Sequence, residues 1–370
     1  MWKKDKKEKS FKKGKPFSKS EKTGRNLKLA LLALLLLGML LILGKAFQFL
    51  SDFQKPFYVL NTKAREYTWN GDSVLNLVVA KTEKNNAGSD LKQLNFVSLN
   101  PKEEEITVIK LSDEVFLDVP KNFGFWKLGS IYKLGQENRP AIGEDLLKMS
   151  VSRMLALPVD GILEIETDRD LDIVKEIESW KSNIFTGFSF LTRVKTDLSL
   201  KEAMDFVSQA SKVRQDKITS LDLLRSAITS SKLLPDSSRV LGVDGVKLDT
   251  FIKQNLNDPA LSQEDLTVAV FNGTDHPGLT SAAVRMINNL GARVTIISNT
   301  SEKFVKNGIY INPREGESID KSRTYKRLSE VFTPNCLQDN CRTSDIEVLN
   351  SRAAINLVLG EEYFNYWSSR

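Results

Sequence analysis

The sequence predicts a membrane-anchored α/β protein whose folded part consists of two domains. Three observations indicate this class. An uncharged apolar run lies near the N-terminus, the chain after it alternates strand-like and helix-like segments, and roughly the last hundred residues open with a strand–turn–helix–strand unit. Such a unit requires a parallel or mixed sheet. The length of 370 residues and the apolar content of 41% suit two modest domains with tails.

The positive charge of the chain is concentrated at the N-terminus. Of a formal net charge of +6, residues 1–26 contribute +8, from eleven Lys and Arg against three Asp and Glu, so residues 27–370 carry −2. A nucleic-acid-binding domain needs a basic face of its own, and we therefore expect no nucleic-acid partner. One histidine and two cysteines exclude most zinc sites, a thiol relay and a scaffold of several disulfides.

The apolar run covers Leu29–Gly44 and is flanked by Lys28 and Lys45. At 1.5 Å per residue it spans roughly 24 Å, against about 30 Å for a bilayer core, and the flanking lysines can snorkel. A cleaved signal peptide is disfavoured by the long basic segment before the run and the lack of an A-x-A site after it. A buried core helix is disfavoured because the run is apolar on every side.

We therefore predict a signal-anchor. Residues 27–50 form the transmembrane anchor of a single-pass protein of the cell membrane, and residues 1–26 are a basic cytoplasmic tail by the positive-inside rule. Residues 51–72 are a stalk, and everything from there on is extracytoplasmic. The tail can contact anionic membrane lipid, and binding of RNA by so simple a lysine-rich sequence is a weaker alternative.

The first exterior domain is predicted to cover residues 73–235. Its expected strands are Val74–Ala80, Leu94–Leu99 and Ile106–Leu111, the last two joined by a turn. Ile142–Leu155 has the period of a helix, and a second helical region over 199–232 begins with a capping box.

Two further segments of this domain carry acidic residues. Asp160–Glu166 alternates as a half-buried strand does, and we expect Glu164 and Glu166 on its solvent side. Asp168–Asp172 begins like a calcium loop, but the sixth and twelfth positions of an EF-hand are wrong, so a solvated loop is the better interpretation.

Polar sequence at 236–264 is predicted to be a linker, and the second domain then covers 265–366. Its expected elements are the strand Leu266–Phe271, the turn Asn272–Gly278, a helix ending at Gly291, the strand Arg293–Ile297, a helix at Ser318–Phe332 and a closing strand at Ala354–Leu359.

The turn after the first strand of this domain is a candidate binding site. Asn272, Gly273, Thr274 and Gly278 precede a helix N-terminus, where backbone N–H groups can bind an anion. The alternative, which we favour, is a tight turn in which Gly273 supplies a positive φ and Asp275 or His276 caps the helix.

Cys336 and Cys341 are close in sequence and can form a disulfide if the domain lies outside the membrane; two free thiols are the alternative. Two cysteines cannot form a structural zinc site, so no metal site is predicted.

The second domain resembles the C-terminal domain of LytR–CpsA–Psr cell-envelope proteins. The resemblance lies in VAVFNGTDHPGLTSAAVRMINNLGARVTII and INLVLGEEY, and it covers about residues 265–365. The first domain is similar to a degenerate LytR–CpsA–Psr catalytic domain, through FVSLNPKEEEITVIKLSDEVFLDVP, GFWKLGSIYKLG, LALPVDGILEIE and VKTDLSLKEAMDFV. The resemblance implies cell wall biogenesis. The catalytic domain of that family transfers a glycopolymer from polyprenyl pyrophosphate to a wall acceptor, using arginines, aspartates and a divalent metal.

This chain departs from the family's pattern at the residues that bind phosphate. Asp113 stands where an S-I-P-R-D motif has its arginine, and an R-S-D motif is reduced to Gly88-Ser89-Asp90. The late arginine-rich segment has no counterpart between Asp172 and Val194. A carboxylate in place of an arginine replaces attraction for pyrophosphate by repulsion.

We therefore predict a non-catalytic binding or scaffolding role in wall glycopolymer assembly or maintenance, with no cofactor. The expected partners are membrane lipid and a glycopolymer, its polyprenyl-pyrophosphate carrier or an envelope ligase. The alternative is a diverged phosphotransferase with Mg²⁺, in which Asp90, Glu114, Lys127 and Arg153 are the site residues that the resemblance leaves. Transcriptional regulation through the basic tail has the least support, because the folded mass lies on the other side of the membrane.

Overall fold

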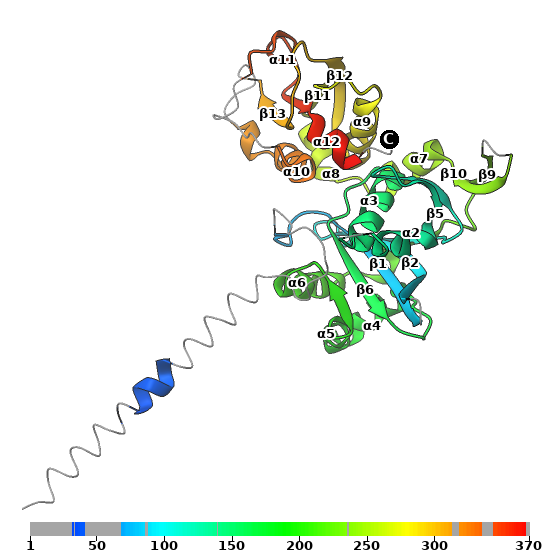
Figure 1. Cartoon of the computed structure of the whole chain (residues 1–370). Helices are drawn as coiled ribbons and strands as arrows, with labels where there is room; N and C mark the ends of the chain where they lie inside the picture. Colours follow the sequence, from blue (N-terminus) through cyan, green and yellow to red (C-terminus); the bar gives the residue numbers. More distant parts are fainter. Residues whose placement is uncertain are drawn as a thin grey trace, which may run out of the picture. The chain divides into compact units, whose positions relative to one another are not determined.

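The computed structural model (Figure 1) describes Leu32 and residues 34–40, 68–85, 88–138, 140–234, 237–312, 318–334 and 343–367. The chain divides into two compact units, Met1–Asp52 and Phe53–Arg370. In the first unit, Leu32 and residues 34–40 are helical. Among the described residues, no helix has the length and apolar character needed to span a membrane. The tail, most of the predicted anchor and stalk, Cys336 and Cys341 lie outside the described residues.

The second unit is built first on a six-stranded mixed sheet in the order β7-β6-β1-β2-β3-β8. Its strands are β1 (Leu75–Asn85), β2 (Gly88–Asn100), β3 (Glu105–Leu111), β6 (Gly161–Glu166), β7 (Val194–Thr196) and β8 (Ile218–Asp222). The predicted strand pair is confirmed, because Leu99 of β2 lies opposite Ile106 of β3 in an antiparallel ladder. β1 runs parallel to β6, and β3 runs parallel to β8.

Helices cover both faces of this sheet (Figure 1). They are α2 (Leu128–Gln136), α3 (Gly143–Leu155), α4 (Ile173–Ser182), α5 (Ile184–Leu191) and α6 (Leu200–Ala210). Val78 and Phe96 pack with the apolar residues of α2 and α3, whereas Val79 and Val97 pack with those of α4, α5 and α6. Because both faces are covered, the central strands are apolar at nearly every position.

Two local predictions, the capping box and the helix that ends at Leu155, agree with the structure. The capping box forms at α6: Ser199 Oγ accepts from the Glu202 backbone N–H, and the Glu202 carboxylate accepts from the Ser199 backbone N–H. Helix α3 begins one residue after the predicted start and ends at the predicted Leu155. The predicted helical region over 199–232 is wrong beyond Ala210. The chain there forms a short 3₁₀ turn (Gln215–Lys217), β8 and β9 (Thr229–Leu233), because β3 offers a sheet edge that β8 completes.

The predicted linker differs from what the structure contains. Residues 239–264 form β10 (Arg239–Val243), α7 (Gly245–Asn255) and α8 (Pro259–Glu264). Leu248, Ile252 and Leu261 of these helices are buried in the same apolar cluster that covers the α2–α3 face of the sheet. The polar residues that suggested a linker include Asp244 and Asp258, and these are the side chains that cap α7 and α8.

A second, four-stranded sheet has the order β12-β11-β14-β13. Its strands are β11 (Thr267–Asn272), β12 (Arg293–Asn299), β13 (Gly308–Ile311) and β14 (Ile355–Leu359). The accompanying helices are α9 (Leu279–Leu290), a 3₁₀ turn (Ile319–Lys321), α10 (Arg323–Phe332), α11 (Ile346–Leu349) and α12 (Glu361–Trp367). β11 is parallel to β12 and β14, which confirms the predicted strand–turn–helix–strand unit. The last strand lies inside the sheet, between β11 and β13.

One apolar cluster extends from the first sheet to the second. It contains Phe96 and Leu147 of the first domain, Leu248 of α7, and Val268 and Leu357 of the second sheet. The two sheets therefore belong to one compact unit, in which α7 and α8 pack one apolar side into the shared cluster through Leu248, Ile252 and Leu261.

Candidate functional site

The candidate site lies at one end of the first sheet. β1, β3, β6 and β8 all run in the same direction, so their carboxyl ends meet at a single edge, the usual location of ligands in open α/β sheets. Asp90 lies at this edge, on β2 opposite Glu83 of β1. The side chain of Asp90 is outside the described part of the chain.

Two of the predicted residues, Glu114 and Lys127, come together here. They flank the hairpin of β4 (Phe116–Val119) and β5 (Gly124–Lys127), in which Phe116 lies opposite Lys127. Lys127 Nζ donates to Glu114 Oε2 at 2.7 Å. The two side chains are 43% and 58% exposed, so this is a solvated ion pair rather than a preorganised phosphate clamp.

Arg153 is also paired with a carboxylate. Its Nη2 donates to Asp118 Oδ2 on β4 at 2.8 Å, and its Nη1 donates to the Trp367 carbonyl at 2.5 Å. Arg153 lines a groove of about 660 Å³ whose other walls include Leu233 and Met286. Both basic residues predicted as candidates for phosphate binding, Lys127 and Arg153, therefore form an ion pair with a carboxylate.

A buried polar cluster at the same edge was missed by sequence reasoning. Its members are Thr82 of β1, Tyr132 and Gln136 of α2, Glu144 of α3 and Glu164 of β6. The Tyr132 hydroxyl lies 3.2 Å from Glu164 Oε2 and 3.4 Å from Glu144 Oε1. Thr82 Oγ1 donates to Glu164 Oε1 at 2.9 Å, and Gln136 Nε2 donates to Glu144 Oε1 at 3.1 Å.

The solvent-facing position predicted for Glu164 is wrong. Glu164 is 2% exposed, because β6 is an interior strand and its side chain points under α2 and α3, whereas Glu166 at the end of the strand is exposed. The alternation of apolar and acidic residues from Ile162 to Glu166 is typical of a strand with one face in solvent. The only signal in the sequence for a buried partner of Glu164 is Tyr132, whose hydroxyl can donate to a carboxylate.

Burial sets the protonation of this cluster. Burial raises the pKa of the Glu144 carboxyl, and the nearby Glu164 carboxylate raises it further. Burial and the same two carboxylates raise the pKa of Tyr132 far above its usual value, so the phenol keeps its proton. Glu144 Oε2 has no hydrogen-bond partner among the described residues. Burial therefore shifts Glu144 toward its protonated form, and no Lys, Arg or His belongs to the cluster.

We predict that Glu144→Gln changes the pH dependence of stability. The folded state raises the pKa of Glu144, so its stabilising effect is complete below the unfolded value near 4.5 and is lost as pH rises through the folded pKa. The variant is expected to lack that loss and to be more stable at pH 8 by on the order of 1 kcal/mol. Urea unfolding from pH 4 to pH 8 measures it. Glu166→Gln, at the exposed end of β6, is the control, and an equal effect of both would contradict the assignment.

The described side chains of this edge form no divalent-cation site. Within the described residues, no three His, Cys, Asp or Glu side chains converge on a possible metal position. The Glu114 carboxylate is already bound to Lys127. We therefore derive no reaction step through a metal.

The second predicted binding site, the turn after β11, uses its polar atoms internally. Asn272 Oδ1 accepts from the Thr274 backbone N–H and hydroxyl, and Asn272 Nδ2 donates to the His276 carbonyl. His276 stacks on Phe364, with ring centroids 3.3 Å apart. A role of Asn272, Gly273, Thr274 and Gly278 in binding a ligand stays a prediction.

Two details of the tight-turn interpretation are wrong. The residue with positive φ is Gly278, at +81°, and it is Gly278 rather than Asp275 or His276 that stands at the N-cap of α9. Gly273 is required for another reason. A Cβ there would lie 2.9 Å from the Leu359 carbonyl oxygen and from Phe304 Cβ. At the other end of α9, Gly291 takes the left-handed C-cap conformation, as the helix stop predicted.

Comparison with known families identifies the second domain. Residues 265–363 match the model of LytR_C, described as LytR cell envelope-related transcriptional attenuator, so the predicted LytR C-terminal domain is confirmed. No curated protein sequence matches the chain.

Several solved structures are similar to part of the chain. The Bacillus subtilis transcriptional regulator YvhJ has 13% identity and a TM-score of 0.38, over 50% of this chain and 98% of that one. TagV of B. subtilis has 13% identity and a TM-score of 0.38, over 48% and 94%. The LytR-CPS2A-psr family protein YwtF (TagT), solved with bound octaprenyl pyrophosphate lipid, has 13% identity and a TM-score of 0.35, over 55% and 96%.

Proposed function

We propose that this chain, whose residues 265–363 form a LytR C-terminal domain, binds or scaffolds components of wall glycopolymer assembly without catalysing their transfer. The proposal includes a single-pass membrane anchor at residues 27–50, an N-terminus in the cytoplasm and extracytoplasmic domains. The +8 charge of residues 1–26 and the uncharged run Leu29–Gly44 support this topology.

The charge of the sheet edge is the observation that carries the non-catalytic role. Lys127 and Arg153 are each paired with a carboxylate, and the buried polar cluster of β1, β6, α2 and α3 contains Glu144 and Glu164 without a described basic partner. A pyrophosphate ester carries at least two negative charges, and its transfer needs preorganised cationic donors. The buried acidic cluster has no cationic donor, and Lys127 and Arg153 are already paired with carboxylates, so none of these residues is a preorganised donor for pyrophosphate.

The close approach of Glu114 and Lys127 favours the second candidate, a diverged phosphotransferase. In this alternative a bound anionic substrate displaces Glu114 from Lys127 and takes its place as the partner of the ammonium group. The displaced carboxylate would then have to act as a base or a ligand near the same substrate, with Asp90 at the adjacent end of β2.

The two candidates differ in a transfer assay. The full chain, in sealed vesicles, is incubated with a polyprenyl-pyrophosphate-linked oligosaccharide and Mg²⁺, and released lipid monophosphate is measured. We expect no release above the protein-free control. Release that is lost in Lys127→Ala would establish the phosphotransferase instead. Trypsin added outside right-side-out vesicles should digest the C-terminal domain, and its full protection would contradict the proposed topology.

A further inference from the structure

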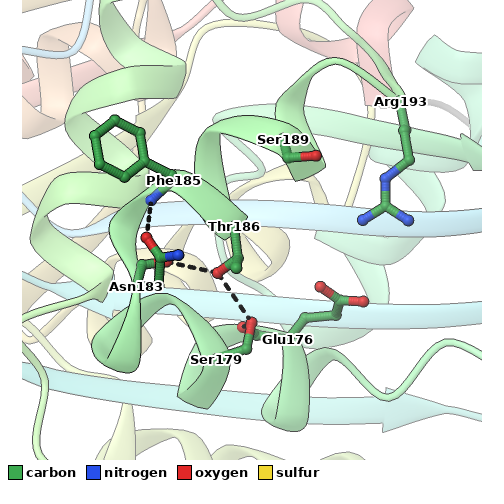
Figure 2. Close-up of a pocket in the computed structure, with 7 residues that line it drawn as sticks. All are labelled: Glu176, Ser179, Asn183, Phe185, Thr186, Ser189 and Arg193. Atoms are coloured by element: carbon green, nitrogen blue, oxygen red, sulfur yellow. Dashed lines mark hydrogen bonds between the residues drawn. The ribbon is translucent and has the colours of Figure 1, made fainter.

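A second polar hollow lies on the far side of the first sheet from the site described above, at the junction of α4 and α5. It has a volume of about 600 Å³. Its lining combines three hydroxyls, one amide, one acid, one base and one aromatic ring, and the residues are Glu176, Ser179, Asn183, Phe185, Thr186, Ser189 and Arg193. Figure 2 shows the Ser179 and Thr186 hydroxyls between the Phe185 ring on one side and the Glu176 and Arg193 side chains on the other.

The hydroxyls of this hollow are held in fixed positions by the helix junction. Asn183 follows the last residue of α4 and caps α5, with its Oδ1 accepting from the Phe185 backbone N–H at 3.0 Å. Thr186 Oγ1 donates to the Asn183 carbonyl at 2.6 Å, and Ser179 Oγ donates to the Glu176 carbonyl at 2.6 Å. The Ser179 and Thr186 hydroxyl oxygens also lie 3.3 Å from each other (Figure 2). A hydroxyl oxygen has two lone pairs, so both oxygens keep acceptor capacity toward the hollow. The Asn183 amide N–H groups have no partner among the described residues.

The two charged groups of the hollow, on Glu176 and Arg193, are paired neither with each other nor with another described residue. Neither the Glu176 carboxylate nor the Arg193 guanidinium forms a hydrogen bond or ion pair with another described residue. The guanidinium is positioned by the Phe190 ring, whose centroid lies 5.8 Å away. One acid and one base give the hollow no net charge, so it offers hydrogen bonds of both polarities without selecting an ion.

The aromatic ring of the hollow is presented to solvent. Phe185 is 74% exposed, whereas Phe190 and Trp180 on the same two helices are buried in the core. An exposed phenyl ring beside a row of fixed hydroxyl, amide and charged groups matches the chemistry of a sugar. A pyranose has an apolar C–H face that packs on an aromatic ring and an equatorial rim of hydroxyls that exchange hydrogen bonds.

We propose that the α4–α5 hollow is a binding site for a neutral saccharide, with Phe185 packing on the sugar face and Asn183, Arg193 and Glu176 bonding its hydroxyl or amide groups. This inference rests on the proposed function and deepens it, because it names neutral glycan as the ligand class and separates glycan binding from the sheet edge. An anionic polymer is disfavoured, since Glu176 would repel each phosphate or carboxylate that Arg193 attracts.

The test uses the full chain in detergent micelles and equilibrium dialysis against tritiated chitotetraose, a neutral N-acetylated tetrasaccharide. Saturable binding is expected, with half-saturation below about 10 mM chitotetraose. Phe185→Ala and Arg193→Gln should each weaken it about fivefold to tenfold. Phe125→Ala removes a ring that is 62% exposed on the β4–β5 hairpin, and this matched control should leave binding unchanged.

Three outcomes would overturn the assignment: no saturable binding, equal loss in Phe125→Ala, or tighter binding of tetragalacturonate, the anionic counterpart. These results are distinguishable from failure of the proposed function. Turnover in the transfer assay would remove the non-catalytic role while leaving the saccharide site intact. Loss of chitotetraose binding would remove the site while leaving a scaffolding role at the sheet edge.

Discussion

Arg327→Ala is expected to lower the free energy of unfolding by about 3–5 kcal/mol, which is the usual cost of removing one partner from a buried ion pair. Arg327 lies on α10 of the LytR C-terminal domain, and its two terminal nitrogens each donate to a different oxygen of Asp160 at 3.1 Å. The side chains are 5% and 3% exposed. The substitution would leave the Asp160 carboxylate, one residue before β6, buried without its guanidinium partner.

Urea unfolding of the full chain at pH 7 measures this effect, and an exposed pair provides the control. Arg293 and Asp265 form an ion pair at 3.1 Å with side chains 57% and 68% exposed, so Arg293→Ala should cost less than about 1 kcal/mol. Arg327→Met combined with Asp160→Asn should recover part of the loss. The amide oxygen can still accept from the Asn76 backbone N–H, and no charge is left at position 160. The recovery is only partial because Glu330 Oε2, which accepts from Arg327 Nη1 at 3.0 Å, also loses its partner, although its side chain is 28% exposed. Equal losses for Arg327→Ala and Arg293→Ala would contradict the buried-pair account.

Trp180→Ala is expected to cost about 3–5 kcal/mol, as truncations of large buried aromatic residues do. Trp180 is fully buried, with ring centroids 5.2 Å from Phe190 and 5.8 Å from Phe206. The indole ring also packs closely against α5 at Gly187, because a Cβ on that glycine would lie 3.0 Å from Trp180 Cγ. A cavity at this point would remove the support of the α4–α5 junction.

The comparison with Trp180→Phe separates packing from hydrogen bonding. Trp180 Nε1 has no hydrogen-bond partner among the described residues, so a phenyl ring loses volume but also removes a buried, unsatisfied donor. We therefore expect Trp180→Phe to cost about 1–2 kcal/mol in urea unfolding, well below the alanine variant. A phenylalanine variant as unstable as the alanine variant would show that the indole N–H is satisfied.

The ion pair between Arg327 and Asp160 also bears on the domain organisation. It joins the second sheet's helix layer to the first sheet, at the opposite end of β6 from Glu164. Together with the apolar cluster that includes Leu248 and Leu261 of α7 and α8, it makes the two domains one packed unit.

The elements that could be predicted from the sequence are those whose signals are local. Ser199 and Glu202 cap a helix through atoms three residues apart, and Gly291 ends one because its own backbone conformation disfavours a side chain. The strand pair Leu94–Leu99 and Ile106–Leu111 is joined by a short turn, and the LytR C-terminal domain was identified from a continuous segment. In each case the signal lies within one continuous stretch of the chain.

What the tertiary structure alone decided depends on partners far apart in the chain. Glu164 was expected in solvent, and it is buried because α2 and α3 cover β6 and bring Tyr132 and Glu144 to its carboxylate. The sequence makes Lys127 and Arg153 candidates for phosphate binding, whereas the fold pairs them with Glu114 and Asp118. The number and sign of charges in a segment are properties of its sequence. Whether a charge is solvated, paired or protonated depends on which distant residues fold against it, because burial and neighbouring charges shift the balance between these states.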